Sequence, residues 1–243
     1  MQKLPKRKYV NHIQVDWSYE DMIKGIDLLK SPPDLERFDQ AYFFTEGNHI
    51  IQGFLYVHEG KPVVIPEPEP SILYYANSQR VLDEILNFRT DIFNSLGLEN
   101  ATKIDLLFSD FFLTSFNFII NLFASIEAFN NSVIPEDFTY RHKKQLMNRD
   151  KIQRYARFDL KMENIAPEIF GKSFVADYPA KYELLKTLKE VRDNLIHTKN
   201  FSKNWAASYR DIYRELLAFK YDDALKSTKE YMNYYKSNWI ENH

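Results

Sequence analysis

A long apolar segment, residues 104–132, constrains the fold more than any other stretch of the chain. Its residues 111–126 carry no charge, so the segment belongs either in the centre of a helical bundle or in a bilayer. The uncharged stretch is shorter than the ~20 residues that a spanning helix needs. Polar residues also recur along it at helical spacing: Asp110, Thr114, Asn117, Asn121 and Ser125. We therefore expect a central core helix and no membrane partner.

One acid in this segment, Glu127, does not belong to the polar stripe. It falls at helical spacing below Phe116, Ile120 and Phe123, on the apolar face. A buried carboxylate requires a partner. We expect that partner to be Arg192, which borders the apolar stripe of another predicted helix.

The composition favours helices and a cytoplasmic location. Only 6 of the 243 residues are glycine, which favours helices over sandwiches and over glycine-rich phosphate loops. The absence of cysteine removes disulfides, cysteine-ligated metals and cysteine nucleophiles. The histidines show no metal-ligand spacing, so we expect neither metal nor cofactor. With a net charge of −2, any site for a polyanion has to be local.

A proline-rich connector, residues 66–70, divides the chain into an N-terminal appendage (residues 1–70) and a helical bundle (residues 71–243). In the appendage we expect an extended or irregular arm over 1–17, short helices over 18–29 and 34–44, and a β-hairpin over 49–57 and 61–65. A buried helix over 42–57 is the alternative to the hairpin. In the bundle we expect helices over about 74–96, 104–132, 159–169, 177–199 and 204–235.

The densest positive run lies between residues 141 and 157, where Asp150 is the single acid. Its basic residues are Arg141, Lys143, Lys144, Arg149, Lys151, Arg154 and Arg157. Such a run is suited to the phosphate backbone of RNA, and Tyr140 and Tyr155 are placed to stack on bases. A solvated helix face, paired with acids elsewhere, is the alternative interpretation.

The hexapeptide Arg192–His197 (RDNLIH) closes the helix predicted over 177–199, whose expected buried stripe consists of Leu184, Leu188, Val191 and Leu195. Asp193 and His197 are four residues apart, so we expect them to touch and Asp193 to orient the imidazole. Arg192 and His197 are five apart, roughly 140° around a helix at ~100° per residue. They can face one substrate if the helix ends at His197, or if a second copy of the chain supplies the other half.

This hexapeptide resembles the R-x4-H signature of the HEPN superfamily, in which Asn, Asp or His usually follows the arginine. The segment Ser125–Pro135 (SIEAFNNSVIP) is similar to poorly characterised bacterial HEPN-like families, in which a long aromatic helix ends in S-x-E before Asn and Ile-Pro. Together the resemblance covers about residues 104–235. It implies an all-α bundle of HEPN type, with the N-terminal appendage added to it.

The resemblance implies a metal-independent endoribonuclease with a role as a toxin or in phage defence. His197 would handle the proton of the 2′-OH or of the leaving oxygen, and Arg192 would stabilise the phosphorane. Asp193 would orient His197, Asn194 would bond phosphate or the mate subunit, and Glu127 would hold Arg192. Products would carry a 2′,3′-cyclic phosphate and a 5′-OH.

The resemblance also bears on partners. We expect a two-fold homodimer with both R-x4-H motifs in one cleft. HEPN toxins silenced by a nucleotidyltransferase carry Tyr two residues after the histidine, whereas this chain has Lys199, which puts such an antitoxin in doubt. Two other functions remain open: a non-catalytic interaction module, with Arg192, Asp193, His197 and Glu127 as a buried network, and a nucleotide-binding regulator that uses the basic run.

Overall fold

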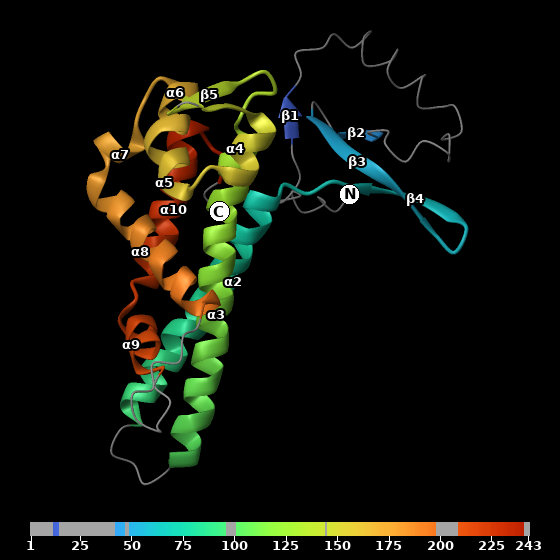
Figure 1. Ribbon diagram of the computed structural model, residues 1–243. Helices are drawn as coiled ribbons and strands as arrows, with labels where there is room; N and C mark the ends of the chain where they lie inside the picture. The colour runs from blue at the N-terminus through green and yellow to red at the C-terminus, as the bar shows by residue number, and fades with distance from the viewer. Residues whose placement is uncertain are drawn as a thin grey trace. The chain divides into compact units, whose positions relative to one another are not determined.

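The computed structural model describes residues 12–14, 42–46, 49–95, 101–143, 145–197 and 209–240. The chain divides into two compact units, residues 1–69 and 70–243. Helices make up most of the described chain, and the N-terminal unit carries a small sheet (Figure 1). The predicted fold class, predominantly helical with a small N-terminal β appendage, is confirmed.

The N-terminal unit contains four strands: β1 (His12–Gln14), β2 (Tyr42–Glu46), β3 (His49–His58) and β4 (Lys61–Pro66). Strand β3 pairs antiparallel with each of the other three. The turn between β3 and β4 consists of Glu59 and Gly60, with φ of 50° and 76°. Two-residue hairpin turns of type I′ require this left-handed conformation. The predicted hairpin is confirmed, and the alternative helix over 42–57 is wrong.

The short helices expected in this unit are not confirmed. The helix predicted over 34–44 is wrong at its end, because residues 42–44 belong to strand β2. Tyr42, Phe43 and Phe44 are aromatic residues, which pack well on a pleated surface. The rest of that prediction, and the helix predicted over 18–29, lie outside the described residues.

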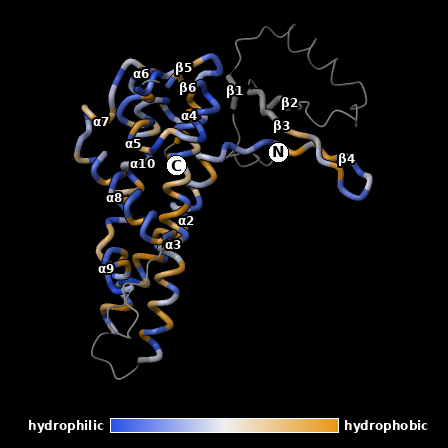
Figure 2. The backbone as a smooth tube through the Cα atoms, viewed as in Figure 1, coloured by the Kyte–Doolittle hydropathy of each residue, from blue (hydrophilic) through white to orange (hydrophobic). Residues whose placement is uncertain are grey.

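The second unit is built on two long helices, α2 (Pro70–Asn94) and α3 (Ala101–Ser132), which run side by side (Figure 1). Asn77 Nδ2 donates to Asn117 Oδ1 at 3.2 Å, and Ser78 Oγ donates to the Phe118 carbonyl at 3.1 Å, so polar contacts also join the pair. Hydrophobic residues recur along α3 (Figure 2). Its fully buried side chains form the centre of the core: Phe111, Phe118, Ile119, Leu122, Ile126 and Phe129.

Helix α3 is the predicted core helix. By length and composition alone, Thr102–Ser132 would also qualify as a membrane span, a test that core helices of soluble proteins pass too. One face of α3 packs against α2, α8 (Pro179–Ile196), α9 (Arg210–Ala218) and α10 (Tyr221–Tyr235). The opposite face leaves Leu106, Leu113 and Phe116 exposed by 62%, 64% and 37%. This exposed apolar stripe bears on assembly.

Between α3 and α8 the chain forms a smaller module with its own apolar cluster of Ile134, Met147, Ile152 and Ile165. Its elements are β5 (Thr139–His142), β6 (Gln145–Asn148), α4 (Arg149–Tyr155), α5 (Phe158–Leu160), the π-helix η1 (Lys161–Ile165), α6 (Ala166–Phe170) and α7 (Phe174–Asp177). Gly171, with φ 67°, is the left-handed C-cap that ends α6. The β5–β6 hairpin was not expected, because the sequence here is dominated by charge.

The helix predicted over 204–235 is wrong in one respect, because α9 ends at Ala218 and α10 begins at Tyr221. Its first residues, 204–208, lie outside the described chain. Phe219 between the helices is extended (φ −63°, ψ 140°), buried, and packed edge-on against Tyr221. The Phe219 carbonyl accepts a hydrogen bond from Arg89 Nη1 at 3.2 Å. The extended backbone at Phe219 interrupts the helix, and Arg89 bonds the carbonyl that the break leaves without a helical partner.

Candidate active site

Helix α8 carries the R-x4-H motif at its C-terminal end. Its buried side chains, at helical spacing, are Tyr182, Leu185, Leu188, Val191 and Leu195. Leu184, expected in this stripe, is half-buried, and Leu185 occupies the core instead. The predicted stripe is therefore right in phase along the second half of the helix.

The helix ends at Ile196, and His197 is its C-cap with φ −100° and ψ 44°. The His197 backbone N–H donates to the Asp193 carbonyl at 2.9 Å, which closes the last turn. The φ of His197 differs from the helical value by roughly 40°, so the Cα–Cβ bond of His197 is turned by about that angle from its helical direction. The side chain is exposed to solvent. One of the two conditions for Arg192 and His197 to serve one substrate, a helix that ends at His197, is thus met.

Arg192 lies at the border of the buried stripe, as predicted, with 30% of its side chain exposed. Its Cζ lies 4.2 Å from the centroid of the Phe123 ring of α3, so the guanidinium rests on an aromatic face. Phe123 is 4% exposed and cannot move without disturbing the core. The guanidinium therefore has a fixed platform.

Asp193 is held by two cations. Arg192 Nη1 lies 2.6 Å from Oδ1, and Lys189 Nζ lies 2.9 Å from Oδ2. Partial burial raises the pKa of the Asp193 carboxyl, but the hydrogen bonds from Lys189 and Arg192 outweigh it, and the pKa lies below its ordinary value. Asp193 is consequently a carboxylate at neutral pH.

The expected contact between Asp193 and His197 is wrong. Among the described side chains, the Asp193 carboxylate bonds Lys189 and Arg192 and makes no ion pair with the imidazole. The spacing of four residues brings side chains together within a helix, but His197 has left the helix. Lys189, four residues before Asp193, remains helical and takes that place.

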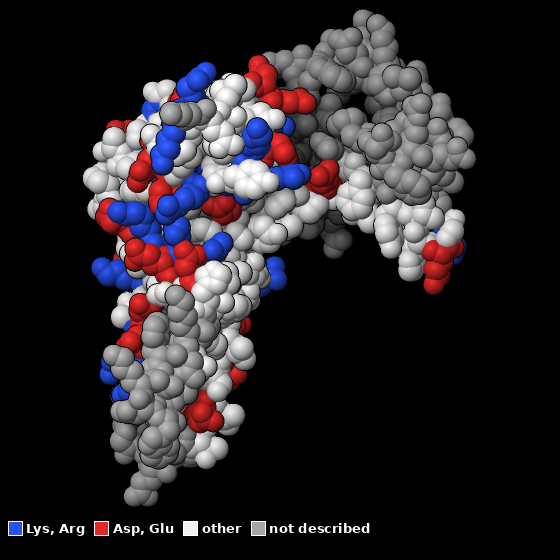
Figure 3. Space-filling model, viewed as in Figure 1, with Lys and Arg blue, Asp and Glu red and all other residues white. Residues whose placement is uncertain are grey.

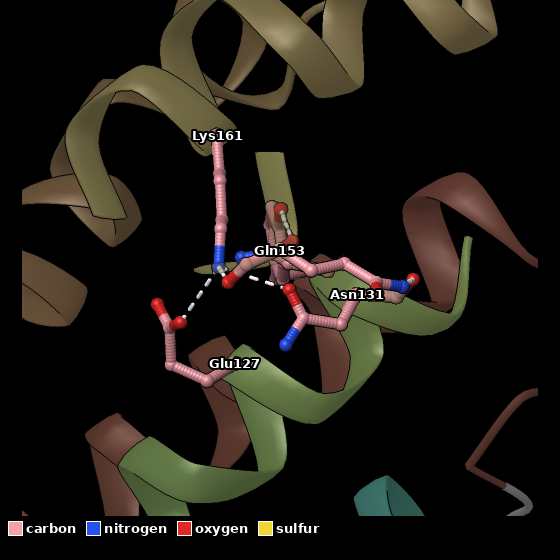
Figure 4. A network of polar contacts seen from close by, with 6 residues as sticks. Glu127, Asn131, Gln153 and Lys161 are labelled. Atoms are coloured by element: carbon pink, nitrogen blue, oxygen red, sulfur yellow. Dashed lines mark hydrogen bonds and ion pairs between the residues drawn. The ribbon is translucent and has the colours of Figure 1, made fainter. Parts of the chain in front are cut away.

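Glu127 does not meet Arg192 either. Lys161 Nζ lies 2.9 Å from Glu127 Oε2, 2.9 Å from Asn131 Oδ1 and 3.4 Å from the Gln153 carbonyl (Figure 4). The Lys161 side chain is 3% exposed, and that of Glu127 is 29% exposed. Glu127 is thus partly buried and paired, as expected, but its partner comes from the π-helix η1.

Lys161 was missed in the sequence although a signal was present. It falls three residues after Phe158 and four before Ile165, both of which are buried. A lysine at that spacing lies on an apolar helix face and needs an acceptor inside the protein. The network joins α3 to α4 and η1, and so attaches the smaller module to the bundle.

Asn194, the third member of the motif, is engaged within the chain. Its Nδ2 donates to Glu215 Oε2 of α9 at 3.0 Å. The bond ties the end of α8 to α9, next to a small apolar hollow lined by Phe112, Leu195 and Tyr213. The Asn194 amide therefore fixes the helix end that carries His197.

The basic residues between 141 and 157 lie on the smaller module. Arg141 and Lys143 belong to the β5–β6 hairpin, whereas Arg149, Lys151 and Arg154 belong to α4, with Arg157 just beyond it. The side chains of Arg141, Lys143, Lys151, Arg154 and Arg157 are exposed, Arg149 is half-buried, and Lys144 lies outside the described residues.

Some of this charge is offset locally. Arg154 pairs with Asp150 at 3.1 Å, and Arg157 lies 3.7 Å from Asp159. Figure 3 shows acidic side chains interspersed among the basic ones on the visible face. Tyr155 is 71% exposed and available for stacking, whereas Tyr140 is half-buried and packs against the His142 ring. The segment is therefore a basic surface on a hairpin and a short helix, and not the single helix face considered above.

Comparison with protein-family models, with curated proteins and with solved structures gave no match. An exposed imidazole at a helix end can transfer a proton, and a guanidinium on a fixed platform can stabilise developing negative charge. Both groups lie at the C-terminal end of α8, within the six residues Arg192–His197.

Proposed function

We propose that this protein is a metal-independent endoribonuclease of HEPN type. The observation that carries the proposal is the end of α8 at Ile196, which leaves His197 exposed and beyond the last helical residue, five residues after Arg192. In a buried structural network of Arg192, Asp193, His197 and Glu127, the imidazole would be enclosed. Instead His197 is exposed, and Glu127 pairs with Lys161. These two facts favour catalysis over the non-catalytic module.

In the proposed reaction, the 2′-oxygen of a ribose attacks the adjacent phosphorus and the bond from phosphorus to the 5′-oxygen breaks. The proton leaves the 2′-OH and a proton is delivered to the 5′-oxygen, so that the products are a 2′,3′-cyclic phosphate and a 5′-OH. His197 carries the proton, and Arg192 stabilises the negative charge of the phosphorane. Asp193, held by Lys189, keeps the guanidinium paired until substrate arrives.

A homodimer completes this proposal. Each chain offers one imidazole at the motif, whereas the reaction needs both a base and an acid, and a two-fold dimer supplies two. The exposed stripe of Leu106, Leu113 and Phe116 lies on the helix that also carries Phe123 beneath Arg192. Ile196, beside His197, is 49% exposed. Burial of these apolar side chains would bring the two motifs toward one groove.

The proposed substrate is RNA, and the proposed setting is that of a toxin or phage-defence nuclease. The exposed cations of β5–β6 and α4 provide the local basic surface that a chain of net charge −2 requires. Tyr155, exposed at the end of α4, adds a ring on which a base can stack.

The test is cleavage of end-labelled RNA by the purified protein in the presence of a chelator. We expect products with 2′,3′-cyclic phosphate ends, and loss of cleavage by at least about a hundredfold in His197→Ala and in Arg192→Ala. His58→Ala is the matched control, because His58 is an exposed histidine of the N-terminal sheet. Cleavage that survives His197→Ala, or its absence in the wild type over a broad panel of RNAs, would overturn the proposal.

A further inference from the structure

The carboxylate of Asp193 lies between two cations, one on each oxygen. Arg192 Nη1 is 2.6 Å from Oδ1, and Lys189 Nζ is 2.9 Å from Oδ2. The three side chains are 30%, 34% and 25% exposed for Arg192, Asp193 and Lys189, so a ligand in solvent can reach all of them. Two cations that hold two oxygens of a carboxylate have the arrangement needed to hold two oxygens of a phosphate.

We propose that Lys189 and Arg192 form one anion cradle, that Asp193 occupies it in the free protein, and that a phosphodiester of the substrate displaces Asp193. Lys189 is then a further substrate-binding residue, outside the R-x4-H motif. The cradle is inferred from the contacts of Asp193 with Lys189 and Arg192, whereas the identity of the anion as an RNA phosphate rests on the proposed function.

The geometry makes the exchange easy. Arg192 and Asp193 are neighbours in sequence, and adjacent residues on a helix do not naturally face each other. Partly exposed ion pairs of this kind contribute little net stability, so an incoming phosphate competes with a weak resident. Lys189 and Asp193 are four residues apart, which keeps the second cation beside the first whether or not Asp193 remains.

Arg192 also stays in place when its partner leaves. Its guanidinium rests on the Phe123 ring at 4.2 Å, and Phe123 is part of the core. The cradle is therefore held by the fold and not by Asp193. In this arrangement Asp193 serves as an internal competitor for the incoming phosphodiester.

The test uses a 2′-O-methyl RNA tetranucleotide with a fluorophore, which binds but lacks the 2′-OH nucleophile. It is short, so that few contacts outside the cradle contribute. Fluorescence anisotropy with the full chain should show a Kd raised about three- to tenfold in Lys189→Met, with a salt dependence reduced by about one unit of slope. Lys189→Arg should restore most of the affinity, because it keeps the cation.

Lys186→Met and Glu190→Gln, on the same helix, are the matched controls for Lys189→Met and Asp193→Asn. Lys186→Met removes a cation one turn earlier that pairs with Glu183 at 2.6 Å, and it should leave the Kd unchanged. Asp193→Asn should tighten binding several-fold, because it removes the internal competitor. Glu190→Gln removes the same charge from an exposed acid of α8 and should tighten binding far less.

Two results would overturn the proposal: Lys189→Met that binds like Lys186→Met, or Glu190→Gln that tightens binding as much as Asp193→Asn. The 2′-OH form of the same RNA, assayed for cleavage in parallel, separates this proposal from the nuclease. Binding that depends on Lys189 without any cleavage would keep the cradle and remove the ribonuclease. Cleavage that depends on His197 while Lys189→Met binds normally would keep the ribonuclease and remove the cradle.

Discussion

Lys161 holds Glu127 from inside the protein. Its Nζ lies 2.9 Å from Glu127 Oε2, although the lysine side chain is 3% exposed. The same ammonium donates to Asn131 Oδ1 at 2.9 Å and reaches the Gln153 carbonyl at 3.4 Å. Three acceptors match the three N–H groups of the ammonium and replace the water it has lost.

Glu127→Ala should lower the free energy of unfolding by about 3 kcal/mol or more, because it leaves the buried ammonium of Lys161 without its counter-ion. Glu127→Gln, which keeps an acceptor oxygen, should cost less. Urea denaturation at equilibrium measures both. Glu230→Ala, which removes the partner of the more exposed Lys181, is the control and should cost less than about 1 kcal/mol. An unfolding free energy unchanged by Glu127→Ala would show that Lys161 does not need the pair.

The basic segment should govern affinity for RNA and not chemistry. Replacing Lys143, Lys144, Arg149 and Arg154 with glutamine should weaken binding and flatten its salt dependence by about one unit of slope for each lost contact. Binding titrations over a series of salt concentrations measure this. A matched set of exposed lysines elsewhere, Lys61, Lys172, Lys220 and Lys226, provides the control with equal loss of charge. Equal effects in the two sets would indicate general electrostatics and no local site.

The exposed stripe of α3 should mediate self-association. Leu113→Glu and Phe116→Glu place a charge in the proposed dimer contact and should shift the protein to a monomer in sedimentation velocity, with loss of RNA cleavage. Leu146→Glu is the control, because Leu146 is a leucine of β6 that is 52% exposed and does not belong to α3. Activity should also fall on dilution below the dimer constant. A wild-type monomer that cleaves RNA at working concentration would exclude the model.

Asp193 should make stability depend on pH in the acid range. Its folded pKa lies below the ordinary value of 3.8, because Lys189 and Arg192 bond the carboxylate. The resulting stabilisation is present above the unfolded pKa and is lost as the pH falls through the folded pKa. Below about pH 4, the melting temperature of the wild type should therefore fall relative to that of Asp193→Asn. A difference that is constant from pH 6 to pH 3 would show that the cations do not hold this carboxylate in solution.

The parts of the fold that could be predicted are those encoded locally. The β3–β4 hairpin follows from the aromatic and β-branched residues around Glu59 and Gly60, and the existence of α3 follows from its long apolar segment. Its phase was predicted only in part, because Phe116, expected on the apolar face, is 37% exposed and Ser125, expected on the polar stripe, is buried. The break at Phe219 was not predicted, because Phe219 continues the helical pattern and its carbonyl is bonded by Arg89, 130 residues away in sequence. The end of α6 at Gly171 could be predicted, because glycine is the residue that most readily adopts the left-handed conformation of a helix C-cap.

The candidate site divides in the same way. The position of Arg192 at the edge of the buried stripe, and of His197 near the helix end, follows from spacing within one helix. The identity of the side chains that pair with Glu127 and Asp193 does not follow from spacing. Lys161 reaches Glu127 from a π-helix, a departure from regular geometry that periodicity does not encode. Lys189 and Asp193 are an ordinary helical pair four residues apart, and spacing alone did not distinguish this pair from Asp193 with His197.

The Phe123 ring has two neighbours of opposite character, the Arg192 guanidinium at 4.2 Å and the Phe158 ring at 5.4 Å. Leucine at position 123 would still fill apolar space but would offer no π face to the guanidinium. The reach of Arg192 toward a ligand is thus set by a residue that no ligand touches. Natural variation at position 123 would change the position of Arg192 without changing any residue that contacts a ligand. Relatives with an aliphatic residue there would need another contact to hold the arginine.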